Sequence, residues 1–148
     1  TIIILDMQMN NKNLTTDNIV EEIIEEFNFF DDWEDKYAHI IDMGKKLEKM
    51  DNELMVEDTK LRGCQSTVYF HSQKESNEKI HFKACSDAAI VQGLIALLLR
   101  VYNNRKSKEI LNTPTDFISK IGLNEHLSVT RKNGLSSMIN AIKSAAKH

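Results

Sequence analysis

The fold of this chain is decided by a stretch that reads KIHFKACSDAAIVQGLIALLLRVY and covers residues 79–102. Its first part alternates between apolar and polar residues, which is typical of a strand with one buried face. The apolar positions are Ile80, Phe82 and Ala84. Residues 88–102 are apolar almost without a break, which predicts a helix that is covered on most sides. We expect Ser86 or Asp87 to cap this helix.

A partner strand is expected just upstream, at Val68–Phe70, and the polar residues 72–78 between the two runs predict an antiparallel hairpin. Antiparallel partners keep a constant sum of residue numbers, and a turn centred near Glu75 gives a sum of about 150. This register would bring Cys64 beside Ser86, at the start of the apolar helix.

Amphipathic helices are expected on both sides of the hairpin. Apolar residues recur at spacings of three and four over residues 19–27, with Asp17 as a plausible N-cap, and a second stripe covers residues 33–47. Further helical pieces are expected at residues 107–111 and 115–121, with a last helix from about residue 130. The pattern predicts an α+β protein in which a small antiparallel sheet packs against several helices in a single domain.

The totals limit the domain organisation and the class of partner. A chain of 148 residues fits one domain, and a net charge of -3 gives no reason to expect nucleic-acid binding. Residues 1–16 have no helical period, so we interpret them as a poorly ordered or artificial lead-in, and residues 17–148 as the domain.

Two cysteines do not make a disulfide framework, and the N-terminus lacks the order of a signal peptide, so we expect a reducing, cytoplasmic location. The most apolar segment, residues 88–99, is too short for a membrane span and is interrupted by Gln92. We expect it to be a buried helix and expect no membrane association.

The chemistry of the chain is concentrated in LRGCQSTVYF, residues 61–70, where Cys64 follows Gly63 ahead of the expected strand. A thiolate is a nucleophile, and a nearby helix N-terminus lowers the pKa of a thiol, whereas a carboxylate such as Asp87 raises it unless a cation such as Arg131 offsets it. The residues alone leave the direction of the pKa shift open, and a cysteine in this setting is more often structural than reactive.

Four ordered blocks of the sequence are similar to those of one known family. They are Trp33, Lys36, Tyr37, Ile40, Ile41 and Gly44; Gly63, Cys64, Gln65, Ser66 and Val68; residues 86–94; and His126, Leu127, Ser128, Arg131, Asn133, Gly134, Leu135 and Met138. At these separations the blocks resemble the SufE family of sulfur-acceptor proteins, and the resemblance covers about residues 17–147.

The resemblance implies that Cys64 receives sulfur as a persulfide from a pyridoxal-phosphate cysteine desulfurase, of SufS-like or CsdA-like type, and passes it to the iron–sulfur cluster assembly scaffold. It implies an accessory sulfur carrier that activates the desulfurase and is not itself an enzyme. No metal or cofactor is expected on this chain, since the pyridoxal phosphate resides on the partner. Residues expected to shape the site or its docking surface are Gly63, Gln65, Ser66, Asp87 and Arg131.

The sequence departs from the family pattern at Val129, where the family usually has proline, and at Cys85, a second cysteine that is not expected. The predicted register would place Cys85 near Cys64, so a disulfide or a persulfide relay is conceivable. Three alternatives stay open: a scaffold that assembles a cluster on its own ligands, a stand-alone thiol hydrolase or peroxidase, and a sulfur acceptor for a parallel desulfurase pathway.

Overall fold

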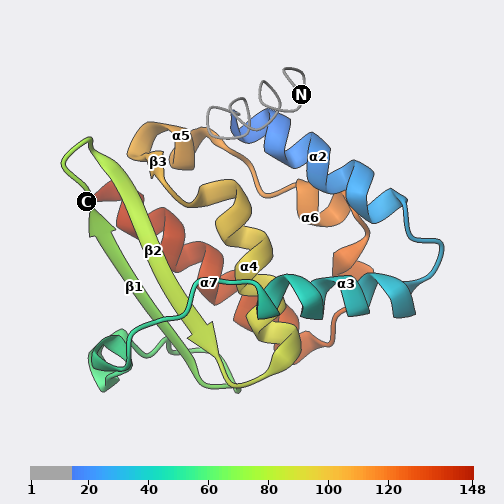
Figure 1. Ribbon diagram of the computed structural model, residues 1–148, viewed down its shortest axis with the longest axis horizontal. Coiled ribbons are helices and arrows are strands. Elements are labelled where there is room, and N and C mark those ends of the chain that lie inside the picture. The colour runs from blue at the N-terminus through green and yellow to red at the C-terminus, as the bar shows by residue number, and fades with distance from the viewer. Residues whose placement is uncertain (1–14) are drawn as a thin grey trace, which may run out of the picture.

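The computed structural model describes residues 15–148, which form an antiparallel sheet packed against helices (Figure 1). The helices are α2 (Thr16–Asn28), α3 (Trp33–Lys45), α4 (Ala89–Tyr102), α5 (Ser107–Asn112), α6 (Phe117–Lys120) and α7 (Val129–Lys147). The strands are β1 (Val68–Lys74), β2 (Lys79–Ser86) and β3 (Arg105–Lys106), and short 3-10 turns occur at η1 (Asn52–Leu54), η2 (Glu57–Thr59) and η3 (Leu123–Glu125). The predicted α+β class is confirmed.

The start of α2 falls at the edge of the described residues. The side-chain oxygen of Thr15 accepts a hydrogen bond from the backbone N–H of Asn18, so α2 begins one residue ahead of the expected cap, Asp17. The lead-in was predicted over residues 1–16. Residues 1–14 of it lie outside the part of the chain that the structure describes.

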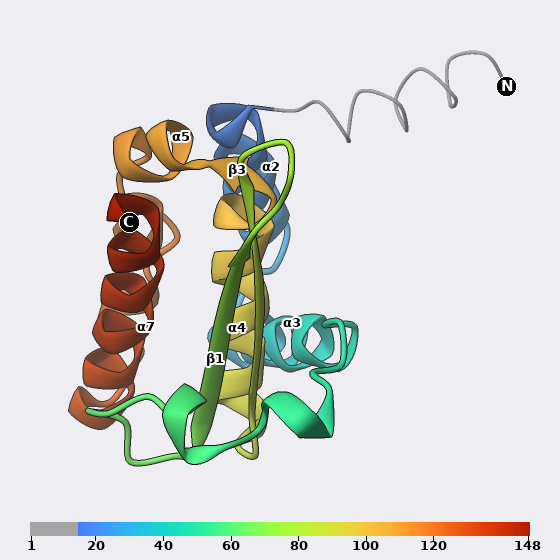
Figure 2. The same cartoon turned by 90° about the vertical axis from the view of Figure 1, so that its left-hand side faces the viewer.

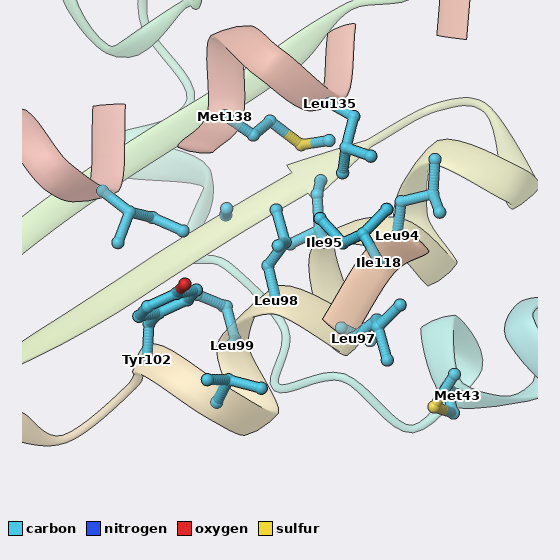
Figure 3. Packing of buried hydrophobic residues seen from close by; sticks show 14 of the residues in the cluster. Met43, Leu94, Ile95, Leu97, Leu98, Leu99, Tyr102, Ile118, Leu135 and Met138 are labelled. Atoms are coloured by element: carbon cyan, nitrogen blue, oxygen red, sulfur yellow. The ribbon is translucent and has the colours of Figure 1, made fainter. Parts of the chain in front are cut away.

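The three strands lie in the order β1-β2-β3, one face of the sheet packs on α4, and α7 also packs on α4. The predicted alternation is confirmed, because Ile80, Phe82 and Ala84 are buried while the residues between them are partly exposed. Figure 3 shows Leu135 and Met138 on the side of α7 that faces α4. The core therefore lies between the sheet, α4 and α7.

The predicted hairpin register is wrong by four residues. A sum of about 150 would pair Phe70 with Ile80, but in the structure Phe70 pairs with Ala84. The polar residues 72–74 extend β1 instead of forming part of the turn, which is confined to residues 75–78. Polar residues suit an exposed strand end as well as a turn, so composition placed the turn too early.

β3 was not predicted, because a strand of two residues carries no periodic pattern. Arg105 pairs with Ile80 and Lys106 with Lys79, which adds a short third strand beside β2. The side chain of Asn103 supports this connection by accepting a hydrogen bond from the backbone N–H of Phe82 at 2.7 Å.

The apolar helix α4 crosses α3 at very close range. A Cβ atom built on Gly93 would lie 2.2 Å from the backbone oxygen of Ile40, and one built on Gly44 would lie 2.7 Å from the backbone nitrogen of Gly93. Only residues without side chains permit this approach. No helix among residues 15–148 is long and apolar enough to cross a membrane.

The entry into α4 differs from the expected cap. Ala88 occupies the N-cap position and provides no side-chain hydrogen bond, so the expectation that Ser86 or Asp87 fills that position is wrong. The Ser86 hydroxyl accepts instead from the backbone N–H of Ala88 at 3.2 Å, and the Gln92 side-chain oxygen accepts from the backbone N–H of Ser86 at 2.7 Å. Because β2 continues as far as Ser86, the helix starts later than the sequence pattern suggested.

The C-terminal segments follow the sequence prediction more closely. Gly122, with φ +79°, ends the short helical piece, and α7 begins at Val129 after the N-cap Ser128. The ring of His126 stacks on that of Trp33 with centroids 3.9 Å apart, which ties the segment before α7 to the start of α3.

Candidate functional site

Cys64 lies on the loop between η2 and β1. The backbone N–H of Leu61 donates to the carbonyl oxygen of Val68 at 2.8 Å and closes the base of this loop. Gly63 has φ +85°, a left-handed conformation that favours glycine and turns the chain sharply just before the cysteine. The loop reaches the end of α7 at which that helix begins (Figure 2).

The sulfur atom of Cys64 rests against the second turn of α7. The Cys64 thiol lies 3.9 Å from the carbonyl oxygen of Gly134, and a Cβ atom built on Gly134 would lie 3.8 Å from the Cys64 Sγ. The absence of a side chain at Gly134 therefore leaves free space directly beside a half-buried thiol.

This space is part of a small cavity of about 20 Å³, enough for roughly one water-sized group. Its floor is apolar and is formed by Val91, Leu94, Leu135 and Met138. The remaining lining residues are Cys64, Gln65, Ser66, Thr130, Arg131 and Gly134. The thiol thus borders a pocket with an apolar floor, polar residues around it and one cation.

Two opposing effects act on the acidity of the Cys64 thiol. Burial raises the pKa of Cys64, and a hydrogen bond with the Ser137 side chain lowers it, with burial the larger effect. The pKa therefore lies above its ordinary value, a direction that the sequence had left open.

The predicted site residues do not all meet at one place. Cys64, Gln65, Ser66 and Arg131 line the same cavity, and Gly63 adjoins it in the chain. Asp87 lies apart from them.

Asp87 lines a separate cavity of about 460 Å³ that also contains Cys85. From the sequence, Asp87 was considered as a carboxylate that would raise the pKa of Cys64. The two residues line different cavities. The predicted placement of Cys64 beside Ser86 is wrong, because Ser86 pairs with Val68 and Cys64 lies four residues further back, against α7.

The second cysteine does not approach the first. Cys85 pairs with Tyr69 in the hairpin, and its thiol contacts the sulfur of Met50 at 3.7 Å. Cys85 lies on the sheet face opposite to Ala84, which points into the core. Both thiols are free, and they line different cavities, so the structure does not bring Cys64 and Cys85 together as the predicted register would.

Sequence reasoning did not single out Gly134 or Ser137 as parts of the site. Gly134 belonged to a matched block, but nothing local connects it to a cysteine seventy positions earlier. The available signal was their spacing of three, which places two small residues on one face of a helix, next to the apolar Leu135 and Met138.

The family model for SufE, described as an Fe-S metabolism associated domain, matches residues 21–146. The chain belongs to the SufE family. This membership associates the protein with iron–sulfur metabolism and confirms the resemblance of the four sequence blocks.

Similar proteins agree with this membership. An uncharacterized SufE-like protein of Rhizobium meliloti is 39% identical over 132 residues, which cover 86% of this chain and 94% of that protein. One of Rhizobium etli is also 39% identical over 132 residues, with 86% and 89% covered. A hypothetical protein from Thermus thermophilus, solved in solution, shares the fold with a TM-score of 0.72 at 18% identity, over 87% of this chain and 93% of that one.

Proposed function

We propose that this SufE family protein is a sulfur carrier in which Cys64 accepts one sulfur atom as a persulfide from a cysteine desulfurase and passes it to an iron–sulfur assembly scaffold. One observation carries the proposal. The chain belongs to a family associated with iron–sulfur metabolism, and its Cys64 thiol borders a cavity of about 20 Å³ with an apolar floor. This cavity has room for about one water-sized group, such as the outer sulfur atom of a persulfide.

The transfer is a thiol exchange that needs no external oxidant or reductant. The thiolate of Cys64 attacks the outer sulfur of a persulfide on the desulfurase; a new sulfur–sulfur bond forms on Cys64, the donor bond breaks, and the donor cysteine leaves as a thiolate. Delivery repeats the step. A cysteine thiolate of the scaffold attacks the outer sulfur on Cys64, and Cys64 leaves as a thiolate.

The cavity explains how the sulfur is kept between these two steps. In this proposal the apolar floor, which includes Leu94 and Leu135, shields the outer sulfur from water and dissolved thiols. Arg131 is among the lining residues and offers a positive charge to a sulfur anion. Gly63 turns the chain sharply just before Cys64 and so helps to direct the sulfur into the cavity.

Asp87 lines a different cavity, so we assign it to docking of a partner and not to the sulfur chemistry. The desulfurase partner, SufS-like or CsdA-like, carries the pyridoxal phosphate, and the carrier itself binds no cofactor. The protein works in the cytoplasm and stimulates the desulfurase by removing its persulfide, without being an enzyme itself.

The alternative of a cluster-binding scaffold is less well supported. Among residues 15–148, no three His, Cys, Asp or Glu side chains are grouped so that they could hold a metal ion. Reconstitution with iron and sulfide distinguishes the two functions: a stable chromophore with stoichiometric iron on this chain would favour the scaffold.

The carrier function is tested by incubating the protein with a desulfurase and free cysteine, followed by mass spectrometry. We expect Cys64 to gain one sulfur and sulfide release to be stimulated. Cys64→Ser should abolish both effects, whereas Cys85→Ser, the matched control at the other free thiol, should retain both. Undiminished stimulation by Cys64→Ser, or an unmodified Cys64 in the parent protein, would contradict the proposal.

A further inference from the structure

The hydroxyl of Ser137 lies where the loop that carries Cys64 touches α7. A Cβ atom built on Gly63 would lie 2.7 Å from the Ser137 Oγ and 3.9 Å from its Cβ. The backbone of Gly63 therefore passes directly under this hydroxyl, closer than any residue with a side chain could. Glycine is favoured at position 63 by its φ of +85°, and a Cβ there would also push the Ser137 hydroxyl aside.

Ser137 and Gly134 form one small-residue face of α7. They are three positions apart, so they lie above one another on the helix surface. Gly134 contacts the sulfur of Cys64 while Ser137 contacts the preceding residue, Gly63. The two residues together hold the sulfur and the turn before it in a fixed relation.

We propose that Ser137 is a positioning residue for the sulfur of Cys64: its hydroxyl donates a hydrogen bond to the deprotonated sulfur, and its contact with Gly63 fixes the turn that directs the sulfur into the cavity. This inference deepens the proposed carrier function and rests on it. It assigns to α7 a residue that favours the thiolate without placing a second charge beside it.

The surroundings of the sulfur show why such a donor is needed. From α4, the residues that face the cavity are the apolar Val91 and Leu94, which leave an anionic sulfur without compensation. From α7, the charged residue that faces it is Arg131, which is exposed to solvent. From the loop, Gln65 and Ser66 face it, and neither is titratable.

A hydroxyl suits both protonation states of the thiol. It accepts a hydrogen bond from the neutral thiol and donates one to the thiolate, so it leaves no buried charge when Cys64 is protonated. Its effect on Cys64 opposes that of burial, which raises the pKa of the thiol. Loss of the hydroxyl therefore leaves the effect of burial unopposed.

The test uses the full chain with Cys85→Ser, which leaves Cys64 as the single thiol. The rate of alkylation by iodoacetamide is followed as a function of pH in this background, in Ser137→Ala and in Ser136→Ala. Ser136 is the matched control because it lies on the same helix and is exposed to solvent. Serine to alanine within a helix does not weaken the helix, so both variants are expected to fold, and circular dichroism checks this.

We expect Ser137→Ala to move the midpoint of the alkylation profile upward by about one pH unit, equal to a roughly tenfold smaller thiolate fraction at neutral pH. Ser136→Ala should leave the midpoint unchanged. Equal midpoints in all three proteins, or equal shifts in both variants, would overturn the role of Ser137. Because alkylation needs no desulfurase, that result would leave the carrier function of Cys64 standing, and failure of persulfide formation would leave the role of Ser137 standing.

Discussion

Replacement of Gly134 by alanine should change stability and sulfur retention in opposite directions. The new Cβ would lie 3.8 Å from the Cys64 Sγ, an ordinary contact distance, so the methyl group fits without displacing the loop. Position 134 is inside α7, where alanine is favoured over glycine by about 0.5–1 kcal/mol. For a chain of this size we expect the melting temperature to rise by about 1–4 °C.

The same methyl group occupies the space beside the sulfur. It is about as large as the water-sized volume of the cavity, so the outer sulfur of a persulfide is displaced toward solvent. The loss of burial for one group of this size is about 0.8 kcal/mol, which reduces the protected population roughly fourfold. Persulfide on Gly134→Ala should therefore be reduced by added thiol roughly fourfold faster than on the parent protein.

Thermal unfolding and timed mass spectrometry of the persulfide measure the two effects. Gly122→Ala is the matched control, since Gly122 has φ +79° and the same substitution there should lower the melting temperature and leave persulfide lifetime unchanged. A fall in the melting temperature of Gly134→Ala would contradict the clearance beside Cys64. An unchanged persulfide lifetime would refute the cavity as the place where the sulfur is held.

Two further predictions concern the frame that carries the site. Gly93→Ala should lower the free energy of unfolding, measured by urea denaturation, by about 3 kcal/mol or more, because the new Cβ would lie 2.2 Å from the backbone oxygen of Ile40 and α3 would have to move. A decrease no larger than that of an ordinary surface substitution would contradict this. Burial raises the pKa of Glu26, but the hydrogen bond and charge of Arg100, with His39, outweigh it and hold the pKa below its ordinary value. The ionised carboxylate therefore stabilises the fold at pH values above the ordinary carboxyl range, and this contribution is lost as the pH falls through the lowered pKa. Glu26→Gln should be less stable than the parent protein at neutral pH, and the difference in unfolding free energy should shrink in acid. A difference that stays constant across pH would refute the assignment.

Much of the fold could be predicted from local patterns. The alternation at Ile80, Phe82 and Ala84 and the apolar run of α4 depend on periods of two and 3.6 residues, which the chain carries in short windows. The family followed from four blocks in order. The boundaries of β1 did not follow, because residues 72–74 are polar and exposed, and local composition does not distinguish a solvated strand end from a turn.

The sequence by itself determined that Cys64 follows a glycine, precedes a strand and lies in a SufE pattern. Only the tertiary structure decided which helix it meets. The thiol lies against Gly134 of α7, and Val91 and Leu94 of α4 line the same cavity. A shift of four residues in the hairpin register was enough to move Cys64 away from Ser86 and against Gly134. The register is set by the packing of the whole sheet, and a contact between residues seventy positions apart leaves no periodic pattern in the sequence.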